Sequence, residues 1–294
     1  MIADEATFNE EHLYECRETL QNVLSDSVYN VRVCFGIYRT DNMNESLSFM
    51  CDKASFAVAS IKDDTHSFIA YYDDTMLEAA IKYKTIVDEF DDAIKVSEFK
   101  MYLQPQISAK TRRLTGAEAL VRRIKPDGTI VSPIDFIPVY EKSGLISRLD
   151  RYIWEQAAAK LGEWKKVGIN MSISVNISPK DFYYIDIFNT FAGLVKKYDI
   201  EPSNLKIEIT ETTIMSDVPN LMGELEELRK AGFTIEMDDF GSGYSSLNTL
   251  KDINIDVLKV DMGFIKETKN VKKSRIILAS VIKMAKELNL LIIT

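Results

Sequence analysis

Acidic side chains recur inside or at the ends of several short apolar segments of the sequence. Glu118 lies in "TGAEALVRRI", Glu208 lies in "LKIEIT", and Asp238 and Asp239 end the run "FTIEMDD". The chain has only two histidines, both far from these acids in the sequence. A metal ion bound here would therefore need oxygen ligands and would be magnesium, manganese or calcium.

Each polar residue also has a simpler interpretation when it is taken alone. Glu118 could form a strand-end salt bridge with Arg122, and Asn176, which ends "SISVN", could cap a turn. Glu208 could be a solvated side chain of an edge strand. Lys259, in "VLKVD", could be a structural counter-ion, or it could orient a water molecule or stabilise charge on a phosphate oxygen.

The recurrence of these groups on successive strands favours a shared site over separate structural roles. Carboxylates brought within a few ångströms repel one another strongly, so they would be neutralised, dispersed or held by cations. Two divalent cations bridged by an aspartate would form a clamp for phosphoryl transfer.

The elements that must position these residues alternate between apolar strands and amphipathic helices. The repeated order of strand, helix and strand favours a parallel sheet. The number of strands suits a (β/α) barrel, in which the strands' carboxyl ends meet at one face, better than it suits a small doubly wound sheet, although the latter fits the same spacing. We predict strands over residues 100–107, 114–124, 172–178, 205–210, 233–240, 256–261 and 290–294, and helices over 148–166, 182–198, 217–231 and 272–288.

The first part of the chain has a different pattern. Residues 1–75 contain one glycine, Gly36, and no proline, with a predicted strand over 30–38 and a predicted helix over 47–62. The apolar spacing over 74–99 predicts a connecting helix. We therefore divide the chain into a small α+β segment over 1–75, a connecting helix over 76–98 and a larger α/β domain over 99–294.

Composition limits the possible partners. The net charge of -9 argues against general affinity for nucleic acid polymers, so an anionic substrate would need a metal or an arginine. Cys16, Cys34 and Cys51 show no CxxC spacing, which fits a reducing, cytoplasmic location rather than a disulfide framework or zinc site. No apolar stretch is long enough for a membrane span, and the acidic N-terminus is unlike a leader.

Seven motifs occur in order over residues 99–294: "YLQPQI", "GAEALVRR", "SPIDFIPVYEKSGLI", "SVNIS", "LKIEITE", "MDDFGSGYSSL" and "LKVD". With these motifs the chain resembles the EAL family of cyclic di-GMP phosphodiesterases. The resemblance implies a TIM-like (β/α)8 barrel whose first strand is antiparallel to the others and which would be C-terminally incomplete in this chain.

The resemblance also implies a function and a set of site residues. The reaction would be hydrolysis of cyclic di-GMP to linear pGpG with Mg²⁺ or Mn²⁺ in a two-metal site, and a homodimer through this domain would be possible. Lys259 would contact the attacking water, and Glu211 would brace the loop after "MDDFG". The metal ligands would be Glu118, Asn176, Glu208 and Asp238, with Asp239 at the second metal, and the substrate-binding residues would be Gln104, Arg122 and Leu120.

This sequence departs from the family pattern at three points. Arg123 stands where an aromatic residue is usual, and Asp181 stands where glutamine is more common. After "LLIIT" the family continues with a segment resembling AEGVE, whose first glutamate is a proposed general base, and later with a glutamine that contacts substrate. We therefore expect the parent protein to be active and this chain to be inactive or impaired. The alternatives are a non-hydrolytic cyclic di-GMP receptor, which would signal through the helix at 74–99, and a scaffold.

The N-terminal segment resembles, more weakly, the last third of a GGDEF diguanylate cyclase domain. The likeness rests on "VRVCFGIY" and "MCDKASFAVASIK". No GGDEF-like turn is present in the sequence, so no phosphate-cradling loop is expected. We expect a degenerate structural remnant without cyclase activity.

Overall fold

The chain divides into two compact units, Met1–Asp88 and Glu89–Thr294, each with its own core. The computed structural model describes residues 7–24, 32–40, 42, 44–62, 64, 66–216, 218, 220–241, 250–251, 253–261 and 271–294. The part of "MDDFGSGYSSL" that follows Gly241 and the first two residues of the predicted N-terminal strand lie outside these ranges. No helix within them is long and apolar enough to cross a lipid bilayer.

The described part of the first unit has three helices and two short parallel strands. Gly36 allows β1 to lie directly against α2, because a Cβ atom there would lie 1.9 Å from the carbonyl oxygen of Ala54. α2 begins after Ser46, whose hydroxyl accepts a hydrogen bond from the Phe49 amide at 3.3 Å. β2 was not predicted. The described elements are α1 (Glu10–Leu24), β1 (Phe35–Ile37), α2 (Leu47–Ser60), β2 (Ile69–Tyr71) and α3 (Asp74–Asp88).

The prediction of a single connecting helix over 74–99 is wrong, because the structure has two helices there. α3 ends at Asp88, and a second, short helix, α4 (Phe90–Lys95), follows it in the other unit. The side chains of Phe90 and Ala93 in this short helix are buried in the second unit. The helix is therefore interrupted where the chain passes from one core to the next.

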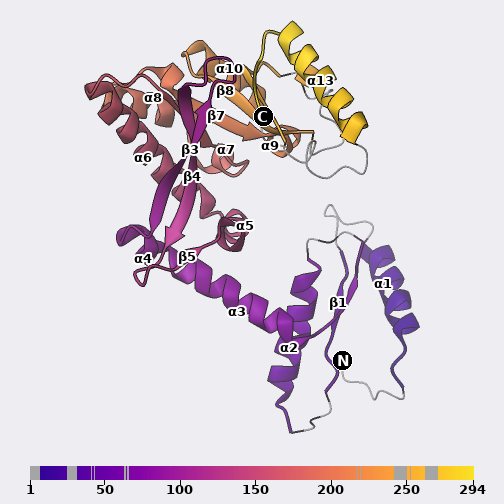
Figure 1. The fold of residues 1–294 in the computed structure, drawn as a ribbon. Coiled ribbons are helices and arrows are strands. Elements are labelled where there is room, and N and C mark those ends of the chain that lie inside the picture. Colours follow the sequence, from indigo (N-terminus) through magenta and orange to yellow (C-terminus); the bar gives the residue numbers. More distant parts are fainter. Residues whose placement is uncertain are drawn as a thin grey trace. The chain divides into compact units, whose positions relative to one another are not determined.

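The second unit contains all seven predicted strands, each within two residues of its expected bounds (Figure 1). The predicted helix over 182–198 is divided into α7 and α8, and a short strand, β5, was not predicted. The elements after α4 are β3 (Phe99–Ile107), β4 (Leu114–Ile124), β5 (Ile130–Val131), α5 (Pro133–Ser143), α6 (Ile146–Lys166), β6 (Ser172–Asn176), α7 (Asp181–Tyr184), α8 (Ile187–Tyr198), η1 (Pro202–Asn204), β7 (Leu205–Thr210), α9 (Glu211–Met215), α10 (Leu221–Lys230), β8 (Ile235–Phe240), β9 (Val257–Val260), α13 (Val271–Glu287) and β10 (Leu291–Ile293).

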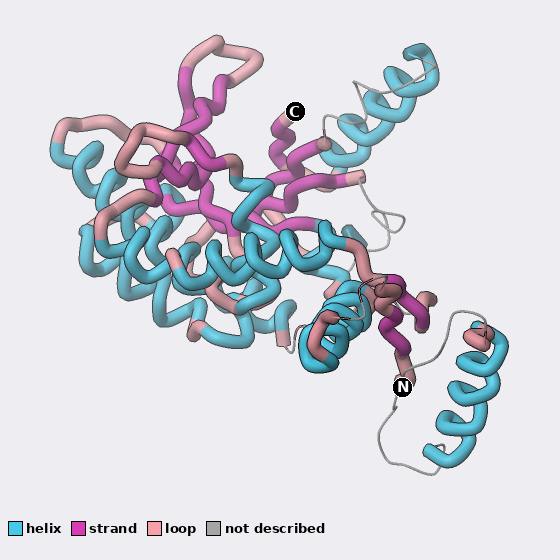
Figure 2. The backbone as a smooth tube through the Cα atoms, turned by 90° about the horizontal axis from the view of Figure 1, so that it is seen from below, coloured by secondary structure: helices cyan, strands magenta, loops and turns pink. Residues whose placement is uncertain are grey.

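The strands of this unit form one sheet in the order β3-β4-β6-β7-β8-β9-β10, with β5 paired to β4. β3 is antiparallel to β4, and each later pair along this path is parallel. The antiparallel first strand expected from the resemblance is thus confirmed. The sheet curls as half a barrel, with a layer of helices along one face, and this arrangement differs from a doubly wound sheet, which carries helices on both faces (Figure 2).

The core lies between the sheet and its helix layer. Along β7, Leu205, Ile207 and Ile209 are fully buried in this core. Side chains alternate along a strand, so Lys206 and Glu208 point to the opposite face, the inside of the half-barrel. Trp154 of α6 is also fully buried and donates its indole N–H to the Asn176 carbonyl at 2.9 Å. The core therefore fixes the strands whose inner face carries the polar residues.

Candidate functional site

Lys259 of β9 lies among three carboxylates on the inner face of the sheet. Its Nζ atom is 2.7 Å from Glu118 Oε2 and 3.4 Å from Asp238 Oδ2, and it donates a hydrogen bond to Glu208 Oε1. These groups come from β4, β7, β8 and β9, and Glu208 is fully buried. The structure therefore brings together four side chains that are up to 141 residues apart in the sequence.

Strand register explains why the side chains meet. Asn176 pairs with Glu208 across β6 and β7, so both residues belong to the same face of neighbouring strands. Gln104 of β3 lies opposite Glu118 of β4, where the strands are antiparallel. The hydrophobic alternation of each strand thus selects which polar residues point toward Lys259.

This cluster carries more negative charge than its one ammonium group neutralises. Burial raises the pKa of Glu208 to about 9, and the hydrogen bond and charge of Asp238 and the charge of Glu118 add to that rise, while Lys259 opposes it. Burial alone would lower the pKa of Lys259, but the surrounding carboxylates hold it above its ordinary value. The net negative charge of the cluster therefore favours the binding of an additional cation.

A backbone irregularity separates Asp238 from Asp239 at the end of β8. The pairing of β8 with β9 shifts between Met237 and Phe240, and Asp239 adopts a left-handed conformation with φ of 55°. This conformation is uncommon outside glycine. The Asp239 side chain is exposed at the surface. Its pKa is raised by partial desolvation of the carboxyl group and by the charges of Asp238 and Asp261. The bulge explains how two successive residues can both lie at the carboxyl end of the sheet.

Glu211 contacts the chain immediately after this bulge. It is the first residue of α9, is 1% exposed, and accepts a hydrogen bond from the Gly241 amide at 3.2 Å. α9 is itself fixed by Thr210, whose hydroxyl accepts from the Thr213 amide at 3.2 Å. Glu211 therefore ties the end of β7 to the residue that follows β8.

The donor chemistry of the cluster fits a hard divalent cation. Three carboxylates already converge on one positive group, and a buried carboxyl with a raised pKa would be relieved by a cation. Within the described ranges, however, no group of three or more His, Cys, Asp or Glu side chains is arranged to hold a metal ion. The Lys259 ammonium lies between these carboxylates.

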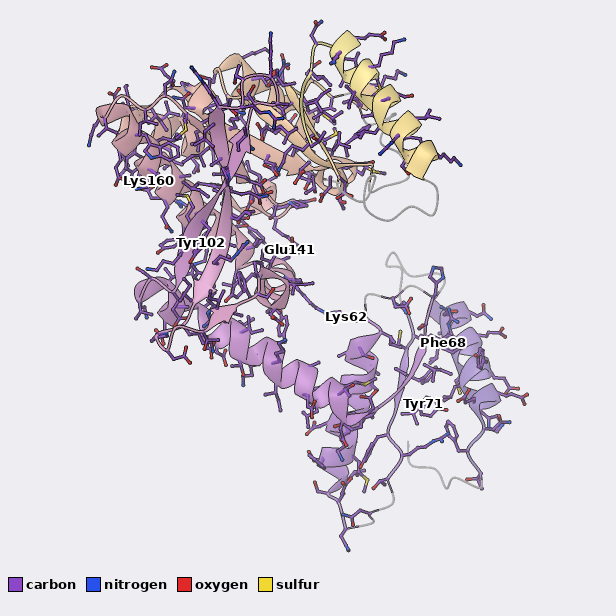
Figure 3. All side chains as sticks on the ribbon, viewed as in Figure 1. Lys62, Phe68, Tyr71, Tyr102, Glu141 and Lys160 are labelled. Carbon is purple, nitrogen blue, oxygen red and sulfur yellow. The ribbon has the colours of Figure 1, made fainter. Side chains whose placement is uncertain are left out.

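A pocket of about 230 Å³ lies at the carboxyl ends of β4, β6 and β7. Three residues predicted for the site line it: Leu120, Arg122 and Asn176. Gln104 is not part of its lining and is exposed on β3, two residues from the exposed Tyr102 (Figure 3). Arg122 and Leu120 thus line the pocket, whereas Gln104 lies outside it on the neighbouring strand, opposite Glu118.

The departure at position 123 has a structural explanation. Arg123 is 3% exposed and points away from the pocket, where its guanidinium donates to Glu98 at 2.8 Å and to Glu89 at 2.7 Å. These ion pairs tie β4 to the start of the second unit. Arg123 therefore holds β4 against the first residues of the second unit.

Sequence reasoning missed two acidic residues that line the pocket, Glu141 of α5 and Asp150 of α6 (Figure 3 labels Glu141). The pKa of Asp150 is raised well above its ordinary value by burial, by the charge and hydrogen bond of Asp181, and by the charge of Glu141. The sequence did contain a signal for Asp150. This acidic residue lies four residues from both Ile146 and Trp154, on the apolar face of α6.

Comparisons with known proteins agree with this geometry. The model of the EAL domain matches residues 87–294. The chain is 33% identical over 241 residues to the signaling protein YkoW of Bacillus subtilis, covering 82% of this chain and 30% of that protein. It is 32% identical over 220 residues to a cyclic di-GMP phosphodiesterase of Pseudomonas aeruginosa, covering 74% of this chain and 38% of that protein. It therefore spans about a third of the length of these relatives.

Among solved structures, the PaMucR phosphodiesterase in complex with c-di-GMP superposes with a TM-score of 0.66 at 31% identity. The superposition covers 71% of this chain and 85% of that one. The strand order, the antiparallel first strand and the match of the family model over most of the chain lead to one conclusion. The chain belongs to the EAL domain family.

Proposed function

We propose that the second unit binds cyclic di-GMP and that its parent protein hydrolyses this ligand to linear pGpG. The observation that carries the proposal is the convergence of three carboxylates on one cationic group beside a pocket that contains an arginine. Relatives that are cyclic di-GMP phosphodiesterases, and a phosphodiesterase solved with c-di-GMP, support the choice of ligand.

The pocket suits one base of the dinucleotide. Its volume of about 230 Å³ is below the roughly 300–1,000 Å³ typical of sites that enclose a whole small ligand. Leu120 offers an apolar wall, and the Arg122 guanidinium can pair with a phosphate at the pocket's mouth. Gln104, outside the pocket, is proposed to contact the remainder of the ligand on the open inner face of the half-barrel.

Glu118, Asn176, Glu208 and Asp238 are proposed to hold Mg²⁺ or Mn²⁺, with Asp239 at a second cation. When bound, such cations would activate water and stabilise charge on a phosphate oxygen. Lys259 keeps an ammonium group beside the reacting phosphate and orients the attacking water. Glu211 holds Gly241 and so fixes the backbone after Asp239.

The deciding experiment incubates cyclic di-GMP and Mn²⁺ with this chain and with a version to which an AEGVE-like segment has been added after Thr294, followed by separation of the products. We expect pGpG from the extended wild-type protein and about 100-fold less from Asp238→Asn. Asp127→Asn, in an exposed turn, removes the same charge far from the cluster and serves as the control. Full activity of Asp238→Asn would contradict the cation assignment.

The second candidate function is a non-hydrolytic cyclic di-GMP receptor. The pocket lined by Leu120 and Arg122 would serve binding of the ligand with or without hydrolysis. Binding without turnover in either version would support the receptor. Impaired activity of this chain alone, a GGDEF-like origin for residues 1–75, a homodimer and a cytoplasmic location all stay predictions.

A further inference from the structure

The pocket lies where β4 separates from β6. The paired residues of these two strands end at Glu118 and Ser174, although β6 continues beside β7 as far as Asn176. Beyond that point β4 lines the pocket from Ala119 to Arg122, and Asn176 of β6 lines it as well. The width of the pocket therefore depends on where the last residues of β4 are held.

Arg123 holds the end of β4 through two carboxylates. Its guanidinium donates from Nε to Glu98 at 2.8 Å and from Nη2 to Glu89 at 2.7 Å. The backbone carbonyl of Glu98 also accepts a hydrogen bond from the Ile124 amide of β4 at 2.8 Å. The last two residues of β4 are thus anchored to both ends of the segment 89–98, which contains α4 (Figure 1).

This anchor is packed against a buried aromatic cluster. The guanidinium carbon of Arg123 lies 5.8 Å from the centre of the Phe99 ring. The centre of that ring is 5.7 Å from the ring centre of Phe136 and 6.0 Å from that of Tyr140, both on α5. All three rings are fully buried. Because a close-packed core yields only at a cost in free energy, the position of the Arg123 guanidinium is fixed from several sides.

The position of Arg122 depends on the same stretch of β4. Side chains alternate along a strand, so Arg122 faces the pocket while Arg123 faces the anchor. The Arg122 guanidinium donates to the carbonyl of Val121, in its own strand, at 2.8 Å. The place of this guanidinium in the pocket therefore follows the place of β4.

We propose that Arg123 is a positioning residue, which sets the separation of β4 from β6 and so places Arg122 for a phosphate of the ligand. The inference rests on the proposed function. It gives a role to the departure at position 123, because an aromatic side chain there would not bridge Glu89 and Glu98. Without the anchor the end of β4 would shift, and the contact of Arg122 with the phosphate would weaken although no group that touches the ligand had been removed.

The test is a double-mutant cycle, measured by calorimetric titration of the whole chain with cyclic di-GMP in the absence of divalent cations. Arg122→Ala should weaken binding roughly 10- to 100-fold, the effect of losing a charge-assisted hydrogen bond. Arg123→Met should weaken binding about tenfold in the wild-type background but less than about twofold in the Arg122→Ala background, where the contact that it positions is already absent. Arg123→Lys should lie between the wild type and Arg123→Met, because an ammonium is a point charge and does not fork between two carboxylates.

The matched control is Asp91→Asn, which breaks the exposed 2.6 Å ion pair between Asp91 of α4 and Arg148 of α6 and involves no residue of β4. It should bind cyclic di-GMP as the wild type does. Calorimetry measures the number of binding sites separately from their affinity, so a partly folded variant would lose sites rather than affinity. If Arg123→Met does not fold, Glu89→Gln replaces it in the cycle, because Glu89 is the more exposed of the two partners. Glu89→Gln should weaken binding roughly two- to fivefold.

Equal affinity of the wild type and the anchor variant, or equal losses from that variant in the two backgrounds, would overturn the inference and leave the proposed function standing. Unchanged affinity of Arg122→Ala would overturn the inference together with the phosphate contact proposed for Arg122. Failure of the wild type to bind cyclic di-GMP would overturn the proposed function and the inference with it.

Discussion

Three acidic side chains on the inner face of the sheet lie close together although their charges repel one another. Lys259 is the group that offsets the charges of Glu118, Glu208 and Asp238. The types of these residues and their positions on strands could be read from the sequence, since each interrupts an apolar run. Their convergence on an ammonium could not, because it depends on the relative heights of four strands.

Lys259→Ala should therefore lower the free energy of unfolding in metal-free buffer. Removing one partner of a buried ion pair costs about 3–5 kcal/mol. Millimolar Mn²⁺ should restore part of the loss, since a divalent cation can take over the neutralisation. Urea unfolding with and without Mn²⁺ measures both effects, and Lys160→Ala, which removes an exposed pair with Glu163, should change stability by less than about 1 kcal/mol. A loss that Mn²⁺ leaves unchanged would count against a cation site.

Asp150 and Asp181 give a pH dependence of stability with a definite sign. The pKa of each is raised in the folded chain, so between the unfolded value of about 3.9 and the folded values the native state binds more protons than the unfolded state. Their contribution to stability therefore falls as the pH rises through that interval.

Asp181→Asn removes one of the two charges and should raise the free energy of unfolding at neutral pH by about 1 kcal/mol. At about pH 4 the gain should shrink, because both carboxyls of the wild type are then largely protonated. Urea denaturation followed by circular dichroism at the two pH values measures the difference. A gain of equal size at both pH values would contradict the raised pKa of the two carboxyls.

Helices and strands follow their sequence periodicity, and the departures have local causes. The predicted helix over 182–198 is interrupted because Ile185 is extended and Asp186 caps a new helix, accepting from the Asn189 amide at 3.0 Å. The cap residue was visible in the sequence. The bulge at Asp239 was not, because a left-handed aspartate is fixed by the pairing of β8 and β9 rather than by its own preference.

The contact between α6 and α8 depends on a glycine. A Cβ atom at Gly162 would lie 2.9 Å from the Tyr198 carbonyl oxygen, which is backbone and cannot turn aside. Gly162→Ala should therefore destabilise the chain by about 1–3 kcal/mol. Gly193, also in a helix of this layer, has nothing within 4 Å of the same position, so Gly193→Ala should stabilise by about 0.5–1 kcal/mol. Urea unfolding of both variants compares them, and equal effects would contradict this packing.

At the scale of the whole molecule, two cores of different size share one chain. The larger core joins the sheet and helices of the second unit, whereas the first unit buries few large side chains. Strand–helix alternation was enough to predict the α/β class and the positions of the strands. The boundary of the units was not placed by periodicity, since α3 and α4 together have one continuous helical pattern.

Residues 89–294 should fold without the first unit. The ion pairs of Arg123 with Glu89 and Glu98 lie inside this fragment and would be retained. We expect a cooperative thermal transition within about 2–4 °C of the corresponding transition of the whole chain, the shift that about 1 kcal/mol produces in a domain of roughly 150–250 residues. Loss of cooperative melting in the fragment would show that the first unit is needed for the second to fold.

The cation site is the claim on which the proposed chemistry depends, and a Mn²⁺ titration followed by electron paramagnetic resonance of the free ion tests it most directly. We predict saturable Mn²⁺ binding by the wild-type chain, binding weakened at least about tenfold in Asp238→Asn, and unchanged binding in Asp127→Asn. Equal Mn²⁺ affinity in the wild type and Asp238→Asn would contradict the assignment of the carboxylates around Lys259 to a metal.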